Sequence, residues 1–259
     1  MINLEGQTAI VTGAGALTDG IGNGRAAAML LARAGANVMA ADRDLDRAMT
    51  TVDMIEAEGG RAAAIGFDVT DAENCQRVVD ETVERFGCLH ILDNNVGIGS
   101  RGSVVEESYE RWQTVMRVNV DSMFLMSKAA IPAMVNGGAI VNVSSISAIR
   151  PRGLTAYSTS KGAVIALTQA MAVDHGPDNI RVNCVLPGPV YTPMVYGAGM
   201  TEDARTRRAA AAILPREGNG WDVGNSVLFL ASELSSWMTG QCLVVDGGVT
   251  LLAPARDTG

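Results

Sequence analysis

The feature of this sequence that most constrains its fold is the regular alternation of short apolar segments with longer helical ones. Most of the apolar segments are nearly continuous, which is typical of strands buried on both faces of a parallel sheet. They begin at Gln7, Ala36, Arg61, Leu89, Ala139, Ile180 and Gln241. Helical stretches lie between them, including residues 24–34, 45–58, 71–86 and 163–174. Strand and helix repeated in this order predict an α/β fold with a doubly wound parallel sheet of about seven strands and helices on both faces.

The length of the chain suits one domain spanning residues 1–259, and 47% hydrophobic residues supply an ample core. One segment interrupts the alternation, because residues 187–215 contain four prolines and several glycines. Long connections of this kind often carry function, so we predict a lid over residues 191–215. A simple surface excursion is the alternative.

Charge and the supply of reactive side chains exclude several classes of function. A net charge of −8 repels phosphate backbones and argues against nucleic acid as a partner. The sequence has no apolar run long enough to span a membrane, and its first residues lack the basic cluster of a signal peptide. The four cysteines are scattered and His90 lies far from His175, which disfavours a metal site and a Ser-His-Asp triad. We therefore expect reduced thiols, no metal and a cytoplasmic location.

A glycine-rich turn separates the first predicted strand from the helix that follows. Residues 12–24 read TGAGALTDGIGNG, and glycines at such a junction let the backbone approach a pyrophosphate at a helix N-terminus. Asp42 ends the second predicted strand 20 residues beyond Gly22, where a carboxylate that binds the adenosine ribose is expected. The pattern predicts a dinucleotide site, and the carboxylate favours NAD because it would repel the 2′-phosphate of NADP. Asp42 as a plain turn residue is the alternative, and the adjacent Arg43 would soften the repulsion.

Tyr157 and Lys161 form the most informative pair in the sequence. They lie four residues apart and share one face if a helix begins near Tyr157. An ammonium close to a phenol lowers the tyrosine pKa, which makes the tyrosine a usable proton-transfer group. Ser144 and Ser145 end the fifth predicted strand, where a hydroxyl can hydrogen-bond a carbonyl or alcohol oxygen. The pair and the serines together predict an acid–base site.

These motifs resemble those of the short-chain dehydrogenase/reductase family over roughly residues 4–248. The matching positions are the TG…GIG loop with Gly13, Gly20 and Ile21, the pair Asp68 and Val69, NNVG with Asn95 and Gly97, RVNVDSMF with Asn119, the pair Tyr157 and Lys161, LPGPVYT with Val190 and Thr192, and VVDGG.

The resemblance implies a Rossmann-type fold, a homotetramer and hydride transfer between NAD and a secondary alcohol or ketone. It implies that Tyr157 exchanges the proton, Ser145 polarises the substrate oxygen and Lys161 holds the nicotinamide ribose. Asn119 would complete a water-linked proton relay. The resemblance further assigns cofactor contacts to Gly13, Gly20, Ile21, Asp42, Asp68, Val69, Asn95, Gly97, Tyr157, Lys161, Val190 and Thr192. An NADPH-dependent ketoreductase and a non-catalytic dinucleotide-sensing protein are the alternatives.

The sequence departs from the family pattern at several places, of which Val96 in place of the common alanine should be harmless to binding. Six residues instead of three separate Gly13 from GIG, so the sequence leaves open which backbone groups contact the pyrophosphate. Ser144 has the usual spacing of 13 from Tyr157, yet the strand-end pattern VNVSS favours Ser145, which we choose. Asp93 stands where the family has an apolar residue, and a strand-end turn is its only explanation from sequence.

The substrate side is weakly specified by the sequence. Candidate wall residues are Ile98, Ile146, Leu154, Val190 and residues 191–200. They predict a mostly apolar pocket for small cyclic or aromatic secondary alcohols, with plain packing as the alternative. Arg150 and Arg152 lie between the serines and Tyr157, and we interpret them as solvated loop charges rather than ligands of an anionic substrate.

Overall fold

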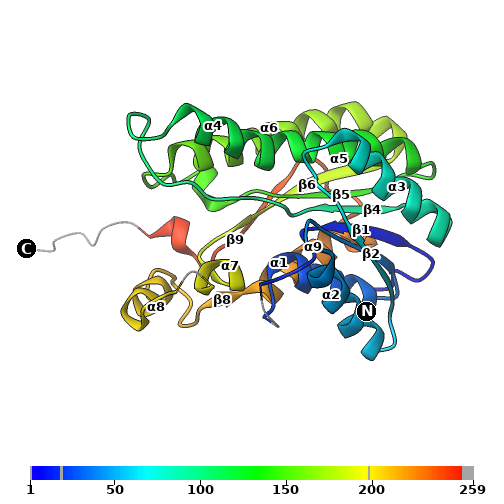
Figure 1. Ribbon diagram of the computed structural model, residues 1–259, viewed down its shortest axis with the longest axis horizontal. Coiled ribbons are helices and arrows are strands. Elements are labelled where there is room, and N and C mark those ends of the chain that lie inside the picture. The colour runs from blue at the N-terminus through cyan, green and yellow to red at the C-terminus, as the bar shows by residue number, and fades with distance from the viewer. Residues whose placement is uncertain (1, 18–19, 198, 253–259) are drawn as a thin grey trace, which may run out of the picture.

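The computed structural model of the chain describes residues 2–17, 20–197 and 199–252. Within them, seven parallel strands form one sheet in the order β3-β2-β1-β4-β5-β6-β9 (Figure 1). The strands are β1 (Thr8–Thr12), β2 (Asn37–Asp42), β3 (Arg61–Gly66), β4 (Ile91–Asn94), β5 (Gly138–Val143), β6 (Ile180–Pro187) and β9 (Cys242–Val245). The chain winds outward from β1 in one direction and from β4 in the other, so the predicted doubly wound sheet is confirmed. Each strand overlaps a predicted segment, and β5 begins one residue earlier than predicted.

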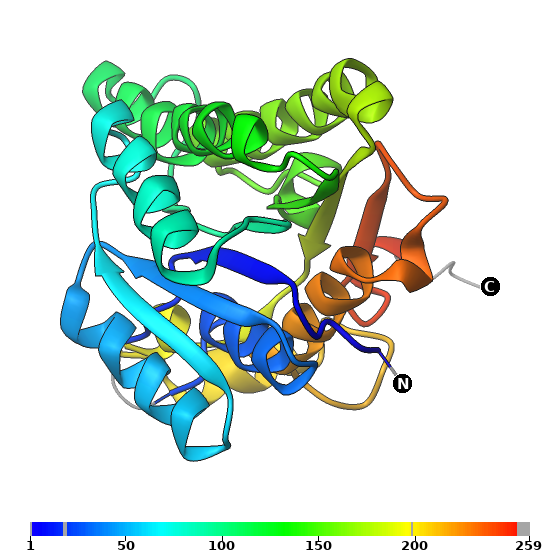
Figure 2. The same ribbon diagram turned by 90° about the vertical axis from the view of Figure 1, so that its right-hand side faces the viewer.

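Helices cover both faces of the sheet, as Figures 1 and 2 show from two sides. One layer holds α1 (Asn23–Arg33), α2 (Leu45–Ala57) and α9 (Gly220–Ala231). The other holds α3 (Ala72–Phe86), α4 (Tyr109–Met116), α5 (Ser122–Ala130) and α6 (Thr155–His175). Short helical turns lie at Arg117–Asp121, Ile131–Ala133, Ile146–Ala148, Gly176–Asp178, Glu233–Ser235 and Val249–Leu251.

The central strands are continuously apolar because each of their faces meets a separate core. Val11 and Ile91 pack in the core beneath α1, α2 and α9. The adjacent residues Ile10 and Leu92 pack in the core on the other face, beneath α3, α5 and α6. Successive side chains of a strand point to opposite faces, so two buried faces remove the polar alternation.

Residues 190–219 form an excursion whose two ends are fastened together. It contains β7 (Val190–Tyr191), α7 (Pro193–Tyr196), α8 (Glu202–Ala209) and β8 (Gly218–Asn219), and α7 and α8 lie together at one end of the molecule (Figure 1). The strands β7 and β8 pair in parallel and join the start of the excursion to its end.

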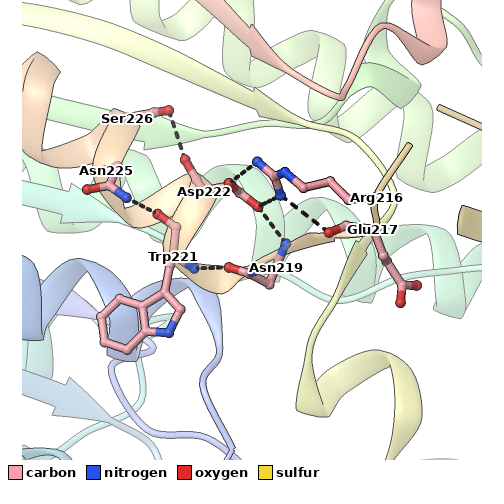
Figure 3. A network of polar contacts seen from close by, with 7 residues as sticks. All are labelled: Arg216, Glu217, Asn219, Trp221, Asp222, Asn225 and Ser226. Atoms are coloured by element: carbon pink, nitrogen blue, oxygen red, sulfur yellow. Dashed lines mark hydrogen bonds and ion pairs between the residues drawn. The ribbon is translucent and has the colours of Figure 1, made fainter. Parts of the chain in front are cut away.

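The far end of the excursion is also held by a polar network at the start of α9 (Figure 3). Arg216 donates two hydrogen bonds to the carboxylate of Asp222, at 2.7 and 2.8 Å. Asn219 and Asp222 form a capping box, in which Asp222 accepts from the Asn219 amide at 2.9 Å. The predicted lid is therefore a loop with two fixed attachment points.

None of the helices in the described part of the chain combines the length and the hydropathy required to span a bilayer.

Candidate active site

A cavity of about 1060 Å³ lies along the carboxyl ends of the central strands. Residues that follow β1, β4, β5 and β6 line it, and so do residues of α6 and of the excursion. The strand order changes direction between β1 and β4. In open α/β sheets, ligands bind in the crevice at that switch point.

The glycine loop lies at one end of this cavity, which Gly13, Gly15, Gly22 and Gly24 all line. Gly13 has φ +65°, and a side chain on Gly24 would place its Cβ 2.2 Å from the Gly13 carbonyl oxygen. Glycine at both positions is therefore required for α1 to start directly beneath the loop. The loop leaves backbone groups at a helix N-terminus facing the cavity, which suits a diphosphate.

Two loop residues predicted to contact the cofactor, Gly20 and Ile21, lie outside the lining of the cavity. Gly20 faces the excursion, because a Cβ on it would lie 2.1 Å from the Tyr196 hydroxyl and 2.6 Å from Pro193. Ile21 packs against the core beneath α1 and α9. Neither residue lines the cavity, whereas Gly22, which belongs to the GIG motif, does, and so do Gly15 and Gly24, which the family pattern did not single out.

The first turn of α9 packs directly on this loop. A Cβ on Gly220 would lie 2.8 Å from the carbonyl oxygens of Gly22 and Ile21. The same turn follows β8 directly. The glycine loop and the base of the excursion are therefore in direct contact.

Asp42, which is partly buried at the end of β2, lines the cavity and also fixes a turn. Its carboxylate accepts hydrogen bonds from the backbone amides of Gly15 and Asp44, both at 3.0 Å. The two roles considered for Asp42 from sequence are thus compatible in one conformation. Arg43 and Arg47 line the same part of the cavity, and Arg47 forms an ion pair with Asp44 at 2.9 Å.

Asp68 and Val69 line the cavity after β3. The Asp68 carboxylate accepts from the Thr70 amide at 2.9 Å and from its hydroxyl at 2.7 Å. These hydrogen bonds hold the pKa of Asp68 below its ordinary value.

Asn95 and Gly97 follow β4 and line the cavity, as do Val190 and Thr192. The Asn95 side chain donates to the Gly13 carbonyl at 3.3 Å. A Cβ on Gly97 would lie 3.0 Å from the Lys161 Nζ, so the absence of a side chain at Gly97 leaves room for the lysine side chain.

Tyr157 and Lys161 lie on consecutive turns of α6, and both line the cavity. The Lys161 ammonium is buried, lies 5.9 Å from the centre of the Tyr157 ring and donates to the Val143 carbonyl at 2.8 Å. Burial lowers the pKa of Lys161 to about 8. We expected Lys161 to lower the pKa of Tyr157, but burial of the phenol is the larger influence and raises that pKa, while a hydrogen bond from Ser145 opposes the rise.

The two serines after β5 point to different partners. Ser144 is buried, and its hydroxyl donates to the Lys161 carbonyl at 2.7 Å, which commits it to the backbone of α6. Ser145 is partly buried, accepts from the Ser147 amide at 3.1 Å and interacts with Tyr157. Ser145 is the serine whose hydroxyl reaches the tyrosine.

Asn119 lies on the π-helical turn Arg117–Asp121 between α4 and α5 and is fully buried. Its Oδ1 accepts from the Ile98 amide at 2.7 Å, and its Nδ2 donates to the Ile98 carbonyl at 3.0 Å. Nδ2 also donates to the Ser160 hydroxyl at 2.9 Å. The residue joins the loop after β4 to α6 and is not among the residues that line the cavity.

The candidate substrate wall is partly assembled at the Tyr157 end of the cavity. Ile98, Ile146, Leu154 and Met194 line it, whereas Tyr191 stacks on Tyr196 with ring centroids 4.7 Å apart. Arg150 is not a solvated loop charge, because its guanidinium donates to the carbonyls of Val249 and Leu252. Arg152 is exposed and lines the cavity.

The sequence did not reveal the environment of two charged residues. Asp93 is fully buried in β4, both its carboxylate oxygens lack a partner among the described residues, and burial raises its pKa to about 8. The only signal in the sequence is a carboxylate within an apolar run. Arg208 lines the cavity from α8 and belongs to none of the recognised motifs. No cluster of metal-binding side chains occurs among the described residues.

Comparisons with known proteins agree with this geometry. The family model described as Enoyl-(Acyl carrier protein) reductase matches residues 15–250. The trans-4-hydroxycyclohexanecarboxylate dehydrogenase of Sinomonas cyclohexanicum is 41% identical over 88% of this chain and 89% of its own length.

Two solved structures superpose closely on the chain. A putative short-chain dehydrogenase/reductase from Burkholderia xenovorans has a TM-score of 0.92 and 38% identity, covering 98% of this chain and 100% of its own. A 7α-hydroxysteroid dehydrogenase in complex with NADH and 7-oxo glycochenodeoxycholic acid has a TM-score of 0.88 and 34% identity, covering 95% of each chain. The chain belongs to the short-chain dehydrogenase/reductase family and is an oxidoreductase of alcohol or ketone substrates with a nicotinamide cofactor.

Proposed function

We propose that this protein is an NAD-dependent dehydrogenase that interconverts a secondary alcohol and its ketone, with Tyr157 as the proton-transfer residue. The observation that carries the proposal is the convergence of Tyr157, Ser145 and Lys161 on the cavity that the glycine loop also lines. A protein that only sensed dinucleotides would need the loop but not these three side chains.

Tyr157 and Ser145 act together on the substrate oxygen. In the oxidation direction, the Tyr157 phenolate accepts the alcohol proton, and the Ser145 hydroxyl donates a hydrogen bond to the same oxygen. The interaction between the two side chains supports this arrangement, because it already favours the ionised phenol. When bound, the nicotinamide ring accepts or returns the hydride, and the protein supplies orientation and electrostatics.

Lys161 and Asn119 hold this site in position. The Val143 carbonyl fixes the buried Lys161 ammonium at the end of β5, 5.9 Å from the centre of the Tyr157 ring, and we propose that it assists the phenolate once substrate and cofactor are bound. We also assign Lys161 to the nicotinamide ribose. Asn119 sets the distance between Ile98 and Ser160, and we place it in the proton relay through the water that its turn would hold.

The cofactor assignment depends on Asp42. Its carboxylate is fixed by two backbone amides at the end of β2, where the ribose of the adenosine would lie, and it would repel a 2′-phosphate. Arg43 and Arg47 in the same lining favour the alternative, an NADPH-dependent ketoreductase. Arg47 is already paired with Asp44, so we propose NAD. The other predicted contacts that line the cavity keep their assignment, whereas Gly20 and Ile21 keep theirs only if the loop rearranges around the cofactor.

The substrate we propose is a small cyclic secondary alcohol. The apolar lining near Tyr157, including Leu154 and Met194, suits a saturated ring. The relative from Sinomonas is named for such an alcohol, trans-4-hydroxycyclohexanecarboxylate. Residues 191–215 would act as the lid over it.

We further propose a homotetramer. Phe124 on α5 and Val173 on α6 are 51% and 77% exposed, which leaves apolar surface on both helices for a second copy. Light scattering with a mass near that of a single chain would refute this assembly. The expected cytoplasmic location stays a prediction.

The experiment that tests the function is a screen of cyclic secondary alcohols with NAD, followed by NADH absorbance, for the natural chain and Tyr157→Phe. We expect the variant to lose about 10²- to 10⁴-fold in turnover because the proton acceptor is gone. Its affinity for NADH, measured by fluorescence titration, should stay within about twofold, because the hydroxyl alone is removed. Near-normal turnover by the variant would remove Tyr157 from the mechanism, and binding of NADH without turnover of any alcohol would favour the sensing protein.

A further inference from the structure

We propose that the substrate carries a carboxylate and that Arg208 binds it, with Arg152 and Arg207 adding positive charge around the same end of the cavity. This inference rests on the proposed function and names the substrate class for the same site.

The first support is the distribution of charge along the cavity. Four arginines line the end that contains Tyr157 and the excursion, namely Arg150, Arg152, Arg207 and Arg208. The carboxylates in the lining are Asp42, which ends β2, and Asp68, which follows β3, and the lining near them also contains Arg43, Arg47 and Arg117. The protein carries a net charge of −8, so its overall field would repel an anionic substrate. The end with Tyr157 thus combines arginines with no carboxylate in its lining, and such a local positive field favours an anion.

The second support is the hydrogen bonding of Arg208. Its Nη2 donates to the Val190 carbonyl at 3.2 Å, which fixes the guanidinium against the strand that leads into the excursion. Its Nε is buried and has no hydrogen-bond partner among the described residues. A buried N–H without an acceptor is unfavourable, and a guanidinium matches a carboxylate with two parallel hydrogen bonds. The geometry therefore leaves Arg208 suited to a carboxylate supplied by a ligand.

Two neighbouring arginines, Arg150 and Arg205, already have partners. Arg150 is committed to the carbonyls of Val249 and Leu252. Glu217 lines a smaller cavity, about 440 Å³, that Arg208 also lines; its Oε2 is paired with Arg205 at 3.2 Å, and its Oε1 is buried without a partner among the described residues. Arg205 in turn stacks on the Tyr191 ring at 4.3 Å. Arg208 is thus the partly buried cation in this lining whose donors stay available.

The position of Arg208 sets where the charge lies on the substrate. The hydroxyl-bearing carbon must reach Tyr157 on α6, while Arg208 approaches from α8 through Val190. The apolar residues Leu154 and Met194 line the same cavity. We therefore infer an alcohol whose carboxylate is separated from the carbinol carbon by an apolar ring or chain, rather than a 2-hydroxy acid.

The cofactor diphosphate is the other anion that could use this arginine, and the experiment separates the two. The probes are trans-4-hydroxycyclohexanecarboxylate and its methyl ester, which keeps the ring and the hydroxyl but has no charge. Both are oxidised at saturating NAD by the natural chain, by Arg208→Gln and by Arg205→Gln. The last variant removes the same charge from α8 outside the lining of the main cavity.

We expect the natural chain to prefer the acid over the ester in kcat/KM by about tenfold or more, the effect of one charge-assisted contact. Arg208→Gln should remove that preference through a higher KM for the acid, with the ester and the KM for NAD unchanged within about twofold. Arg205→Gln should keep the preference. Equal losses for acid and ester, a raised KM for NAD, or no preference in the natural chain would each overturn the inference.

A binding measurement keeps this inference distinct from the proposed function. Cyclohexanecarboxylate, which has no hydroxyl, is titrated calorimetrically into the NADH-loaded natural chain and Arg208→Gln. Binding that Arg208→Gln loses supports the carboxylate site even if no alcohol is turned over, in which case the proposed function alone fails. Turnover of the ester together with no binding of cyclohexanecarboxylate leaves the proposed function standing and overturns the inference.

Discussion

Asp93 imposes a pH dependence on the stability of the protein that one isosteric substitution should remove. The carboxylate lies in β4 between Val11 and Val141 of the neighbouring strands, and neither oxygen has a partner among the described residues. Burial raises its pKa to about 8, from about 3.9 in an unfolded chain. The folded state therefore holds a proton that the unfolded state releases between these two values.

The sign follows from that difference in bound protons. The contribution of the neutral Asp93 carboxyl to the free energy of unfolding is fully present below about pH 4 and is lost as the pH rises toward about 8. The slope is about 1.4 kcal/mol per pH unit, so this group alone costs about 2.7 kcal/mol between about pH 5 and pH 7. Asp93→Asn keeps the shape of the side chain and cannot titrate, so its stability should lack this slope.

The assay is urea denaturation across that pH range at one fixed protein concentration, followed by tryptophan fluorescence. The stability difference between Asp93→Asn and the natural chain should grow by about 2.7 kcal/mol from about pH 5 to pH 7. Asp93→Val should show the same change and be the more stable variant, because it leaves no polar atom buried. Asp53→Asn, which neutralises an exposed carboxylate on α2, is the control and should run parallel to the natural chain. A difference between Asp93→Asn and the natural chain that is constant with pH would refute the reasoning.

Three further predictions concern the site. Ser145→Ala should lower kcat by about 10²-fold or more, because a donor to the substrate oxygen is lost, whereas Ser144→Ala should mainly lower the free energy of unfolding, by about 1 kcal/mol. Steady-state kinetics and thermal melts distinguish the two variants, and the reverse pattern would make Ser144 the serine that assists Tyr157. Asp42→Ala should narrow the preference for NAD over NADP in kcat/KM, because the repelling carboxylate is gone; tighter binding of NADP than of NAD by the natural chain would contradict the ribose assignment. Gly24→Ala should weaken NADH binding by about tenfold or more, since its Cβ would collide with the Gly13 carbonyl, and unchanged affinity in a fluorescence titration would show that the loop tolerates displacement.

The elements that the sequence predicts best are those set by local periodicity. Each central strand is continuously apolar because it is buried on both faces, so β1 and β4 are visible without knowledge of their neighbours. Tyr157 and Lys161 share a face because both lie within α6, which a spacing of four already implies.

Features that depend on distant parts of the chain are less visible in the sequence. Gly20 is placed by Pro193 and Tyr196, more than a hundred residues away, so a motif match alone assigns it to the cofactor. The choice between Ser144 and Ser145 depends on which hydroxyl faces α6. Arg208 reaches the cavity only because the excursion folds back, and its helix shows no chemistry of its own in the sequence.

The contact between α9 and the glycine loop has a kinetic consequence. Gly220 lies against the carbonyls of Ile21 and Gly22, and the chain just before it closes the excursion through β8 and the Arg216–Asp222 pair. A dinucleotide bound on the glycine loop would therefore lie against the segment that joins the excursion, with Arg208 and part of the substrate wall, to α9. The architecture favours an ordered kinetic mechanism, in which the cofactor binds first and dissociates last. The alcohol then binds only to the complex of protein and cofactor, in which the substrate pocket is complete.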